Sequence, residues 1–399
     1  SILESIWSLI PEDSIVIQNN FEFCRHSISS NRIVEINQKI ENRSKSIKNF
    51  YLCNINKISN NVGLQNWYND EYWYSFKIPY DREYVPIVVD SFKRIISKAN
   101  NNIKKCLVLD LDNTLWGGVI GDDALEGIKI GRDDPIGEAY NDFQRYVKSL
   151  SDKGVLLAVC SKNDLSIAKS GFSHPDSVLA LEDFVSFKAS WGPKHLNLIS
   201  ISEDLNIGLD SFVFLDDNPA ERDIVRRNLP QVEVPEVKNV VDYIQSIEDG
   251  DYFNLEGVTE DDKKRSQFYR DNTKRNELRK GIGDYKEYLR SLDMKGKIKQ
   301  FTKIYSSRIS QLSKRTNQFN LTNERFEVDD IINLCDNGEY ITLYGRLKDR
   351  FGDNGLVSAL VGKKESSSLN IELWVMSCRV FNRDFELAMF DELIVKCKQ

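Results

Sequence analysis

Two aspartates spaced two residues apart follow a short apolar segment, and their type and spacing suit phosphate chemistry. The run from Lys105 to Thr114 begins as a buried strand and ends in Asp110 and Asp112, with Thr114 two residues later. Because i and i+2 side chains share one face of a strand, both carboxylates are expected to address one site beyond its carboxyl end. Paired carboxylates need a divalent cation or a shared proton to offset their repulsion. An oxygen nucleophile, an acid/base and Mg²⁺ together suit phosphoryl transfer through an aspartyl-phosphate.

Three later segments fit the same site. A second apolar strand ends at Ser161, and a third ends in the pair Asp216 and Asp217. Lys194 lies in a Trp-Gly-Pro-Lys loop that leads into a helical pattern; Lys188 is an alternative source of the lysine, but the loop context favours Lys194. Strand ends separated by helical stretches predict a parallel sheet with right-handed crossovers. The plainer alternative is that the acids only cap strand ends, and four motifs in one order argue against it.

The series Asp-x-Asp-x-Thr, Ser, Lys and Asp-Asp resembles the four motifs of haloacid-dehalogenase-type phosphotransferases in order and context. The resemblance implies that Asp110 is the nucleophile and Asp112 the general acid/base. It implies that Thr114, Ser161 and Lys194 bind the substrate, the last two through its phosphoryl oxygens. The implied Mg²⁺ ligands are oxygen atoms at strand ends, supplied by Asp110, the Asp112 carbonyl, Asp216 and Asp217.

Length and composition describe a globular protein of several domains. At 399 residues the chain is too long for one ordinary core, so two or three domains are expected. No apolar run is long enough to span a bilayer, and no signal peptide is visible. The seven cysteines are scattered without Cys-x-x-Cys spacing, which favours reduced thiols and a cytoplasmic location. With only three histidines, a metal site is expected to be rich in oxygen ligands, as Mg²⁺ requires.

The net charge of the chain indicates which classes of binding partner to expect. A net charge of −7 argues against nucleic acid as a general partner. The basic stretch Lys263–Lys280 departs from this balance. It is interpreted as the solvated face of a long helix, with a landing patch for an acidic partner as the alternative.

The chain is expected to hold three domains. Residues 1–100 read as a small α/β lead-in, and residues 101–250 as a Rossmann-like α/β domain with a parallel sheet. Residues 257–399 read as an α+β domain. Its expected elements are a charged helix broken at Gly281–Gly283, a strand Lys297–Phe301, helices Ser306–Arg315 and Val328–Asn337, a hairpin of Tyr340–Leu347 with Gly355–Lys363, a strand Leu369–Met376 and a final helix from about Asp384.

This order of elements resembles that of GNAT-type acyltransferases, and it places Cys378 and Arg379 between the last strand and the final helix. A cysteine just before a helix N-terminus and beside an arginine is in a setting that favours the thiolate, the form that attacks carbonyls. Cys378 is therefore the candidate nucleophile of a second site. On local sequence alone, a small core residue at a strand end is an equal alternative, as expected for Cys106 and Cys160.

Several stretches resemble the FkbH-like proteins of polyketide pathways, which build glyceryl-acyl-carrier-protein units. The match runs from about residue 65 to the end and rests on Leu107–Gly121, Cys160–Asn163, Phe214–Arg222, Asn317–Thr322, Asp349–Asp353 and Ser377–Arg379. The resemblance implies that Cys378 carries a glyceryl thioester taken from 1,3-bisphosphoglycerate. The implied acceptor is the phosphopantetheine thiol of an acyl carrier protein. The family commonly has a Gly-Arg pair after this cysteine, where this chain has Asn382 and Arg383.

The resemblance thus predicts a bifunctional glyceryl transferase and phosphatase. The sequence does not decide between a glyceryl and a lactyl product, and it does not give the order of the two steps or the identity of the carrier protein. Residues expected near the acyl group are Arg379, Asp353, Asn317 and Gln318, the last three of which are equally well explained as turn-forming or capping residues. Backbone N–H groups near Val380 are expected to bind the oxyanion. The lead-in reads as a truncated SGNH-hydrolase-like remnant, so the chain is expected to be a piece of a larger protein or to have trimmed ends.

Three alternative functions remain at this stage. One is a plain Mg²⁺-dependent phosphatase whose carboxyl-terminal domain only docks a carrier protein. A second is a scaffold without chemistry, against which the intact aspartate and lysine set argues. The third is an acetyl-CoA-dependent acetyltransferase, but no pyrophosphate-binding loop precedes the final helix.

Overall fold

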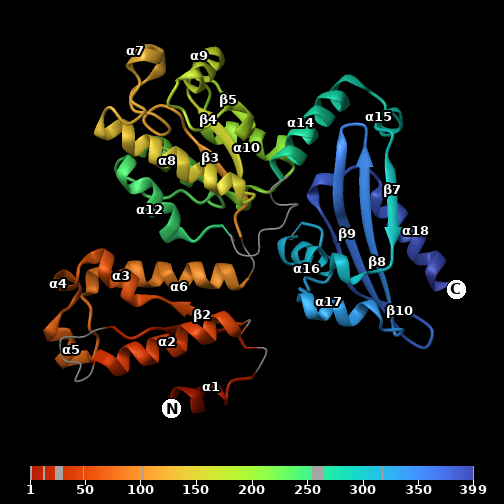
Figure 1. The fold of residues 1–399 in the computed structure, drawn as a ribbon, viewed down its shortest axis with the longest axis horizontal. Coiled ribbons are helices and arrows are strands. Elements are labelled where there is room, and N and C mark those ends of the chain that lie inside the picture. The colour runs from red at the N-terminus through yellow and green to blue at the C-terminus, as the bar shows by residue number, and fades with distance from the viewer. Residues whose placement is uncertain are drawn as a thin grey trace. The chain divides into compact units, whose positions relative to one another are not determined.

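The computed structural model describes residues 2–11, 14–22, 30–47, 49–100, 103–253, 265–316 and 318–398. The chain divides into two compact units, Ser1–Asn102 and Ile103–Gln399 (Figure 1). No helix of the described ranges is long and apolar enough to cross a membrane.

The first unit is a small α/β structure. Its two strands, β1 (Val16–Asn19) and β2 (Phe50–Cys53), pair in parallel. Its helices are α1 (Ile2–Trp7), α2 (Ser30–Ser46), α3 (Ile55–Val62), α4 (Leu64–Trp67), α5 (Asp70–Phe76) and α6 (Val85–Ala99). Trp67 is fully buried between the rings of Tyr80 and Tyr84, at centroid distances of 4.9 and 5.6 Å.

The second unit begins with the predicted parallel sheet. Its strands are β3 (Cys106–Leu109), β4 (Leu156–Ser161), β5 (Phe184–Ala189) and β6 (Phe212–Leu215), in the order β5-β4-β3-β6. The connecting helices are α7 (Ile120–Gly127), α8 (Pro135–Asp152), α9 (Leu165–Ser170), α10 (Lys194–Leu205), α11 (Pro219–Asn228) and α12 (Val240–Gly250). The sequence did not predict β5, and the segment after α11 adds only a parallel bridge between Val213 and Glu233.

Alternating side chains of β3 supply two apolar clusters, one on each face of the sheet. Leu107 and Leu109 pack with residues of α8 and α12, whereas Cys106 and Val108 pack with residues of α10 and α11. Figure 1 shows the sheet between these two helical layers. All four residues are fully buried, so the sheet is a rigid platform for the loops at its carboxyl edge.

The rest of the second unit is built on an antiparallel sheet of order β10-β9-β8-β7. Its strands are β7 (Lys295–Lys299), β8 (Tyr340–Asp349), β9 (Gly352–Lys364) and β10 (Leu369–Met376). The helices are α14 (Arg265–Gly281), α15 (Tyr285–Ser291), α16 (Ser306–Arg315), α17 (Val328–Cys335) and α18 (Phe385–Cys397). The predicted order of elements is confirmed. The hairpin is tighter than expected, because Asp349 already pairs with Gly352.

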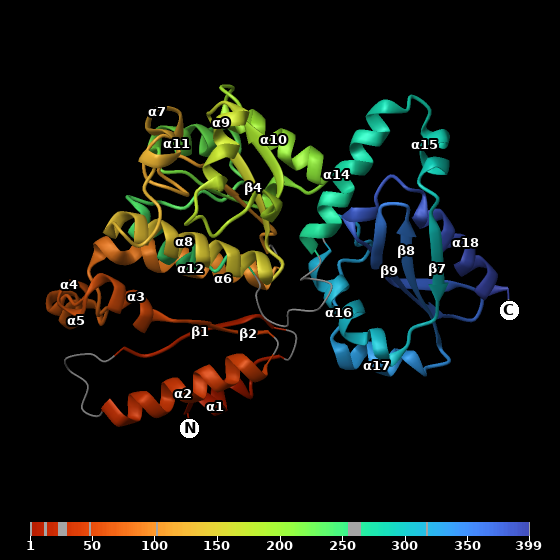
Figure 2. The same ribbon diagram turned by 45° about the horizontal axis from the view of Figure 1, so that its top comes forward.

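Helix α14 joins the two sheets. It contacts β4, β5 and α10 on one side and β9 on the other (Figure 2). Arg275, which is 1% exposed, holds Asp349 of the antiparallel sheet with two hydrogen bonds of 2.7 and 2.8 Å. The interpretation of the basic stretch as a solvated helix face is therefore wrong for its central arginine. Lys263 and Lys264 lie outside the described residues.

Candidate active site

Three carboxylates meet where the central strands of the parallel sheet end. Carboxylate oxygens of Asp110, Asp216 and Asp217 all lie within 4.8 Å of one another. Their meeting follows from register, because Leu109 of β3 pairs with Leu215 of β6 and the aspartates come directly after. The Asp110 amide donates to the Leu215 carbonyl at 3.0 Å, which fixes the start of the loop.

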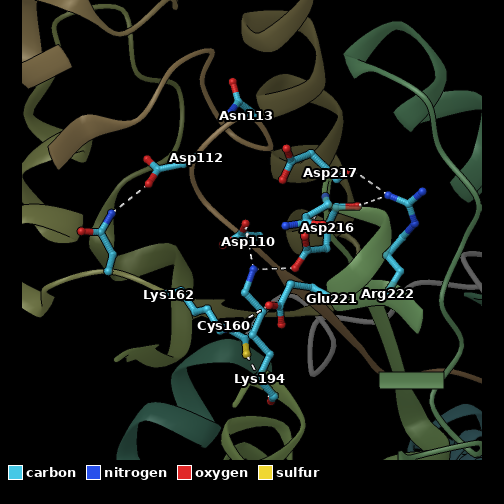
Figure 3. A network of polar contacts seen from close by, with 12 residues as sticks. Asp110, Asp112, Asn113, Cys160, Lys162, Lys194, Asp216, Asp217, Glu221 and Arg222 are labelled. Atoms are coloured by element: carbon cyan, nitrogen blue, oxygen red, sulfur yellow. Dashed lines mark hydrogen bonds and ion pairs between the residues drawn. The ribbon is translucent and has the colours of Figure 1, made fainter. Parts of the chain in front are cut away.

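Lys194 lies inside this cluster (Figure 3). Its Nζ is 2.9 Å from Asp110 Oδ2 and 2.5 Å from Asp216 Oδ2, and all three side chains are less than a tenth exposed. Burial and the neighbouring charge of Asp110 raise the pKa of Asp216 to about 7. Burial opposes the positive charge of Lys194, but the two carboxylates outweigh it and raise the lysine's pKa. The alternative lysine, Lys188, instead pairs with Asp204 at 2.6 Å.

Asp112 follows the same strand but does not place its carboxylate in the cluster. Its Oδ1 accepts from Trp116 Nε1 at 3.0 Å and from the Ile120 amide at 3.1 Å, and its Oδ2 accepts from Asn163 at 3.0 Å. Figure 3 shows the side chain turned away from Asp216. Burial raises the pKa of Asp112, which suits a group that donates a proton. The carboxylate is therefore placed for acid/base work and not for the metal.

The loop after β3 is stabilised by hydrogen bonds whose partners the sequence did not predict. Asn113 adopts a left-handed conformation with φ of 54°, and its side-chain oxygen accepts from the Gly118 amide at 2.9 Å. The Asn113 carbonyl accepts from the hydroxyls of Tyr140 and Tyr243 at 3.2 and 2.8 Å. These bonds orient the segment that carries Asp110 and Asp112.

The two expected hydroxyl groups are buried beside this loop. Thr114 is fully buried and Ser161 is 1% exposed. Within the described ranges, neither hydroxyl hydrogen-bonds to the carboxylate cluster. Ser161 lies at the end of β4, where the sequence placed it.

Arg222 fixes the second acidic pair. Its Nη1 donates to the carbonyls of Asp216 and Asp217 at 2.9 and 2.7 Å, and its Nη2 donates to the Val237 carbonyl at 3.0 Å. The Asn218 amide donates to Asp216 Oδ1 at 2.9 Å. Arg222 ends the segment Phe214–Arg222 that carries part of the family resemblance, but residue spacing alone did not predict that it positions the two aspartates.

The cluster fits Mg²⁺. It offers only oxygen donors, which this hard cation prefers. Asp110 Oδ1 is buried without a hydrogen-bond partner among the described residues, so a ligand atom is available at the centre of the site. Residues that would hold the ion are Asp110, Asp216 and Asp217.

Cys378 lies at a separate pocket of about 550 Å³, a volume that includes space open to solvent. Its Sγ is 3.2 Å from the hydroxyl of Tyr269 on α14, and its carbonyl accepts from Asn206 at 3.1 Å. The cysteine is partly exposed, unlike the fully buried Cys106 and Cys160. Basic residues dominate the polar lining: Lys105, Arg265, Arg308, Arg315 and Arg379.

The final helix starts close to the predicted residue, but the expectation that Cys378 lies directly before its N-terminus is wrong. Cys378 begins a short 3₁₀ turn that ends at Val380, and α18 starts only at Phe385. The Val380 amide donates to the Ser377 carbonyl at 3.1 Å within that turn, so it is not available for an oxyanion. Positive charge at the sulfur therefore comes from pocket side chains and not from a helix dipole.

Only some of the other residues predicted near the acyl group line this pocket. Arg379 and Gln318 line the pocket, and Asn317 lies outside the described residues. Asp353 does not line it: this carboxylate pairs with Arg346 at 3.1 Å and accepts from the Gly355 amide at 2.8 Å, so it stabilises the hairpin.

The Asn-Arg pair after the cysteine is structural. Asn382 has φ of 57°, a left-handed conformation that Gly adopts without strain and Asn tolerates. Arg383 donates to Asp349 at 3.0 Å, to Asn272 at 2.7 Å and to the Arg379 carbonyl at 2.6 Å. Asn382 therefore adopts a turn conformation that Gly would also permit.

No family model and no curated protein sequence matches the chain. Among solved structures, the chain is similar to a crystal structure from Bacteroides fragilis, the N-terminal part of a protein containing a phosphatase domain complexed with Mg. The identity is 34% and the TM-score is 0.54, with 63% of this chain and 76% of the other covered. The magnesium of that structure agrees with the carboxylate cluster described above. The chain therefore belongs to the family of this Bacteroides protein and carries a magnesium-dependent phosphatase domain of the haloacid-dehalogenase type.

Proposed function

We propose that this phosphatase domain works with the Cys378 pocket as a two-site glyceryl transferase and phosphatase. The donor would be 1,3-bisphosphoglycerate, and the acceptor would be the phosphopantetheine thiol of an acyl carrier protein. The observation that carries the proposal is the position of Cys378: its sulfur faces an open pocket rich in positive charge, beside the Tyr269 hydroxyl. A structural core cysteine needs neither feature.

The phosphatase half uses Asp110 and Asp112. A carboxylate oxygen of Asp110 attacks the phosphorus of a phosphomonoester while the bond to the substrate oxygen breaks. Asp112 protonates that leaving oxygen and then takes a proton from the water that hydrolyses the aspartyl-phosphate. Lys194 offsets the negative charge of Asp110 and Asp216 throughout. Magnesium, when bound, supplies positive charge for the phosphoryl oxygens.

The transferase half must conserve the activated acyl group. Attack of Asp110 on the C1 phosphate would release free glycerate and lose the activation. In the productive route, Cys378 Sγ bonds to C1, the C1–O bond breaks, and inorganic phosphate leaves with the electron pair. The carrier thiol then attacks the thioester carbon and its proton passes to the Cys378 sulfur, so one thioester replaces another.

Intact-mass spectrometry tests the proposal. The protein is incubated with 1,3-bisphosphoglycerate, with and without carrier protein, as wild type, Cys378→Ala and Cys335→Ala. Cys335 is another partly exposed cysteine, in α17, and serves as the matched control. An acyl adduct is expected on wild type and on Cys335→Ala but not on Cys378→Ala.

The family match by itself favours a magnesium-dependent phosphatase. The second candidate function is therefore such a phosphatase, with an antiparallel-sheet part that only docks a carrier protein. In that case no protein carries an adduct, and Cys378→Ala hydrolyses phosphomonoesters as fast as wild type in the presence of carrier. That pair of results would overturn the two-site proposal.

A further inference from the structure

The Cys378 pocket offers few groups that can accept the proton of its thiol. No Asp, Glu or His is among the described residues that line it. The arginines of the lining do not give up their protons in a protein. Apart from the thiol itself, the lining residues that can change protonation are Lys105 and Tyr269. A lysine in a partly buried position can act as a base, whereas a tyrosine hydroxyl keeps its proton to about pH 10.

Lys105 differs from the lysine that precedes it. Lys104 is buried and donates to the Asp210 carbonyl at 2.7 Å, so its amine is held by the fold. Lys105 lines the pocket, and within the described ranges its side chain forms no hydrogen bond or ion pair. Its backbone is fixed by ladder bonds to both neighbouring strands, with Ser211 at 2.7 Å and Leu156 at 3.0 Å. A rigid backbone thus presents an amine without a partner to the pocket.

The surroundings of Lys105 make its protonation depend on that of the cysteine. Burial lowers the pKa of Lys105, and the charges of Arg265 and Arg325 lower it further. The charges of Cys378 and Asp210 act in the opposite direction. These groups favour a neutral amine beside the thiol and an ammonium ion beside the thiolate.

Tyr269 acts on the sulfur directly. Its hydroxyl oxygen is 3.2 Å from Cys378 Sγ, and the side chain is almost completely buried. Burial and the charge of Cys378 raise the pKa of Tyr269, so the hydroxyl keeps its proton. Because a thiolate has no proton to give, the hydroxyl can only donate to that form of the cysteine.

We infer that Lys105 accepts the proton of the Cys378 thiol and that Tyr269 then holds the thiolate by donating to Sγ. The inference deepens the proposed function, on which its acyl-transfer steps rest. When Sγ bonds to C1 and the C1–O bond breaks, Lys105 passes its proton to the departing phosphate oxygen. Lys105 then takes the proton of the carrier thiol and returns it to the Cys378 sulfur as the second thioester forms.

The pH profile of Cys378 alkylation tests the inference without any substrate. The probe is iodoacetamide, which reacts with the thiolate, and peptide mass spectrometry follows Cys378 alone. Lys105→Met and Tyr269→Phe should each raise the pKa of the thiol and slow alkylation at neutral pH about tenfold, the loss of one charge-assisted contact. The rates should converge at a pH where the thiol is ionised in every protein. Lys314→Met is the control, since Lys314 pairs with Glu327 and does not line the pocket.

Two results of this experiment would contradict the inference. Profiles of Lys105→Met and Tyr269→Phe that match wild type overturn it and leave the proposed function standing. A lower thiol pKa in Tyr269→Phe also overturns it, because the hydroxyl would then stabilise the neutral thiol as an acceptor.

Lys105→Arg separates proton transfer from charge, because arginine keeps the positive charge but cannot release a proton. Its alkylation at neutral pH should be closer to wild type than that of Lys105→Met. Acyl transfer from 1,3-bisphosphoglycerate to the carrier protein should nevertheless slow about 10²-fold, the lower end of the effect of a general acid/base. Transfer as fast as in wild type overturns the role of Lys105 in proton transfer. Absence of an acyl adduct from wild-type Cys378 overturns the proposed function instead, since alkylation reports on the thiol independently.

Discussion

At the residue scale, Lys194 keeps two buried carboxylates together. Replacing it by methionine leaves Asp110 and Asp216 facing each other without a counter-charge. We expect Lys194→Met to lower the free energy of unfolding in metal-free buffer by about 3–5 kcal/mol, the usual cost of breaking a buried ion pair. Added Mg²⁺ should restore part of this loss, because the cation replaces the missing positive charge. Chemical denaturation with and without Mg²⁺ measures both effects.

The control for this prediction is Lys188→Met. Lys188 also pairs with an aspartate, but its side chain is 30% exposed. Its replacement should cost less than about 1 kcal/mol and show no response to Mg²⁺. Equal losses for the two variants would contradict a special role for Lys194.

A second residue-scale prediction separates acid/base work from metal binding. The Asp112 carboxylate lies outside the carboxylate cluster, whereas that of Asp217 lies inside it. Asp112→Asn should therefore lower phosphatase turnover by about 10²–10⁴-fold, the contribution of a general acid, with little change in Mg²⁺ affinity. Asp217→Asn should mainly weaken Mg²⁺ binding, so that excess Mg²⁺ restores its activity. Phosphatase assays across a Mg²⁺ titration measure the two variants, and rescue of Asp112→Asn by Mg²⁺ would contradict the division.

Sequence reasoning identified residues that meet in the carboxylate cluster but not the residues that support them. Asp110, Lys194 and Asp216 follow from strand ends and motif order, both of which are local signals. Asn163 and Tyr269 act on residues more than 50 positions away in the chain. Such pairs arise from the packing of elements, and one sequence does not contain that information.

At the element scale, the missed and misplaced elements have physical reasons. Strand β5 alternates apolar and polar residues along an edge of the sheet, so it lacks the continuous apolar run of β3 and β4. The final helix starts at Phe385, close to the predicted Asp384, but Cys378 does not lead directly into it, because Asn382 and Asp384 both have positive φ and interrupt the backbone before α18. A positive φ at Asn or Asp is permitted but not required, so the composition of this segment did not reveal it.

The attachment of α14 to the antiparallel sheet gives an element-scale prediction. Asp349 is fully buried between Arg275 of α14 and Arg383. Asp349→Asn leaves two guanidinium groups without their counter-charge and should lower the free energy of unfolding by about 3–5 kcal/mol at neutral pH. Urea denaturation measures the loss. Asp353→Asn, at a half-exposed hairpin carboxylate, is the control and should cost less than about 1 kcal/mol.

The same ion pairs make this stability dependent on pH. Burial opposes the charge of Asp349, but the two arginines outweigh it and lower the carboxyl's pKa below its ordinary value. A lowered pKa in the folded state gives stability that is complete above the unfolded value, about 3.9, and is lost as pH falls through the folded value. Wild type should therefore lose stability more steeply than Asp349→Asn below about pH 4. Parallel slopes in this range would show that the arginines do not hold the carboxylate charged.

At the scale of the whole molecule, helix α14 makes the phosphatase domain and the antiparallel sheet parts of one unit. Its Tyr269 belongs to the same apolar cluster as β3, β4 and α10, and Cys378 packs against that cluster. The bounds expected from sequence, 101–250 and 257–399, separate stretches of distinct pattern. They do not reveal that α14, which belongs to the second of these stretches, completes the apolar core of the first.

This shared core predicts how the chain can be divided. A fragment of residues 103–399 should keep the magnesium-dependent phosphatase activity of the full chain, because it contains one compact unit. A fragment of residues 103–253 loses α14, which exposes apolar surface of β4, β5 and α10 and removes a buried tyrosine. Loss of one large buried side chain alone costs about 3–5 kcal/mol, a large part of the stability of a typical domain. Thermal unfolding and a phosphomonoester assay on both fragments measure the difference. Equal melting temperatures would mean that α14 only covers the sheet and does not support it.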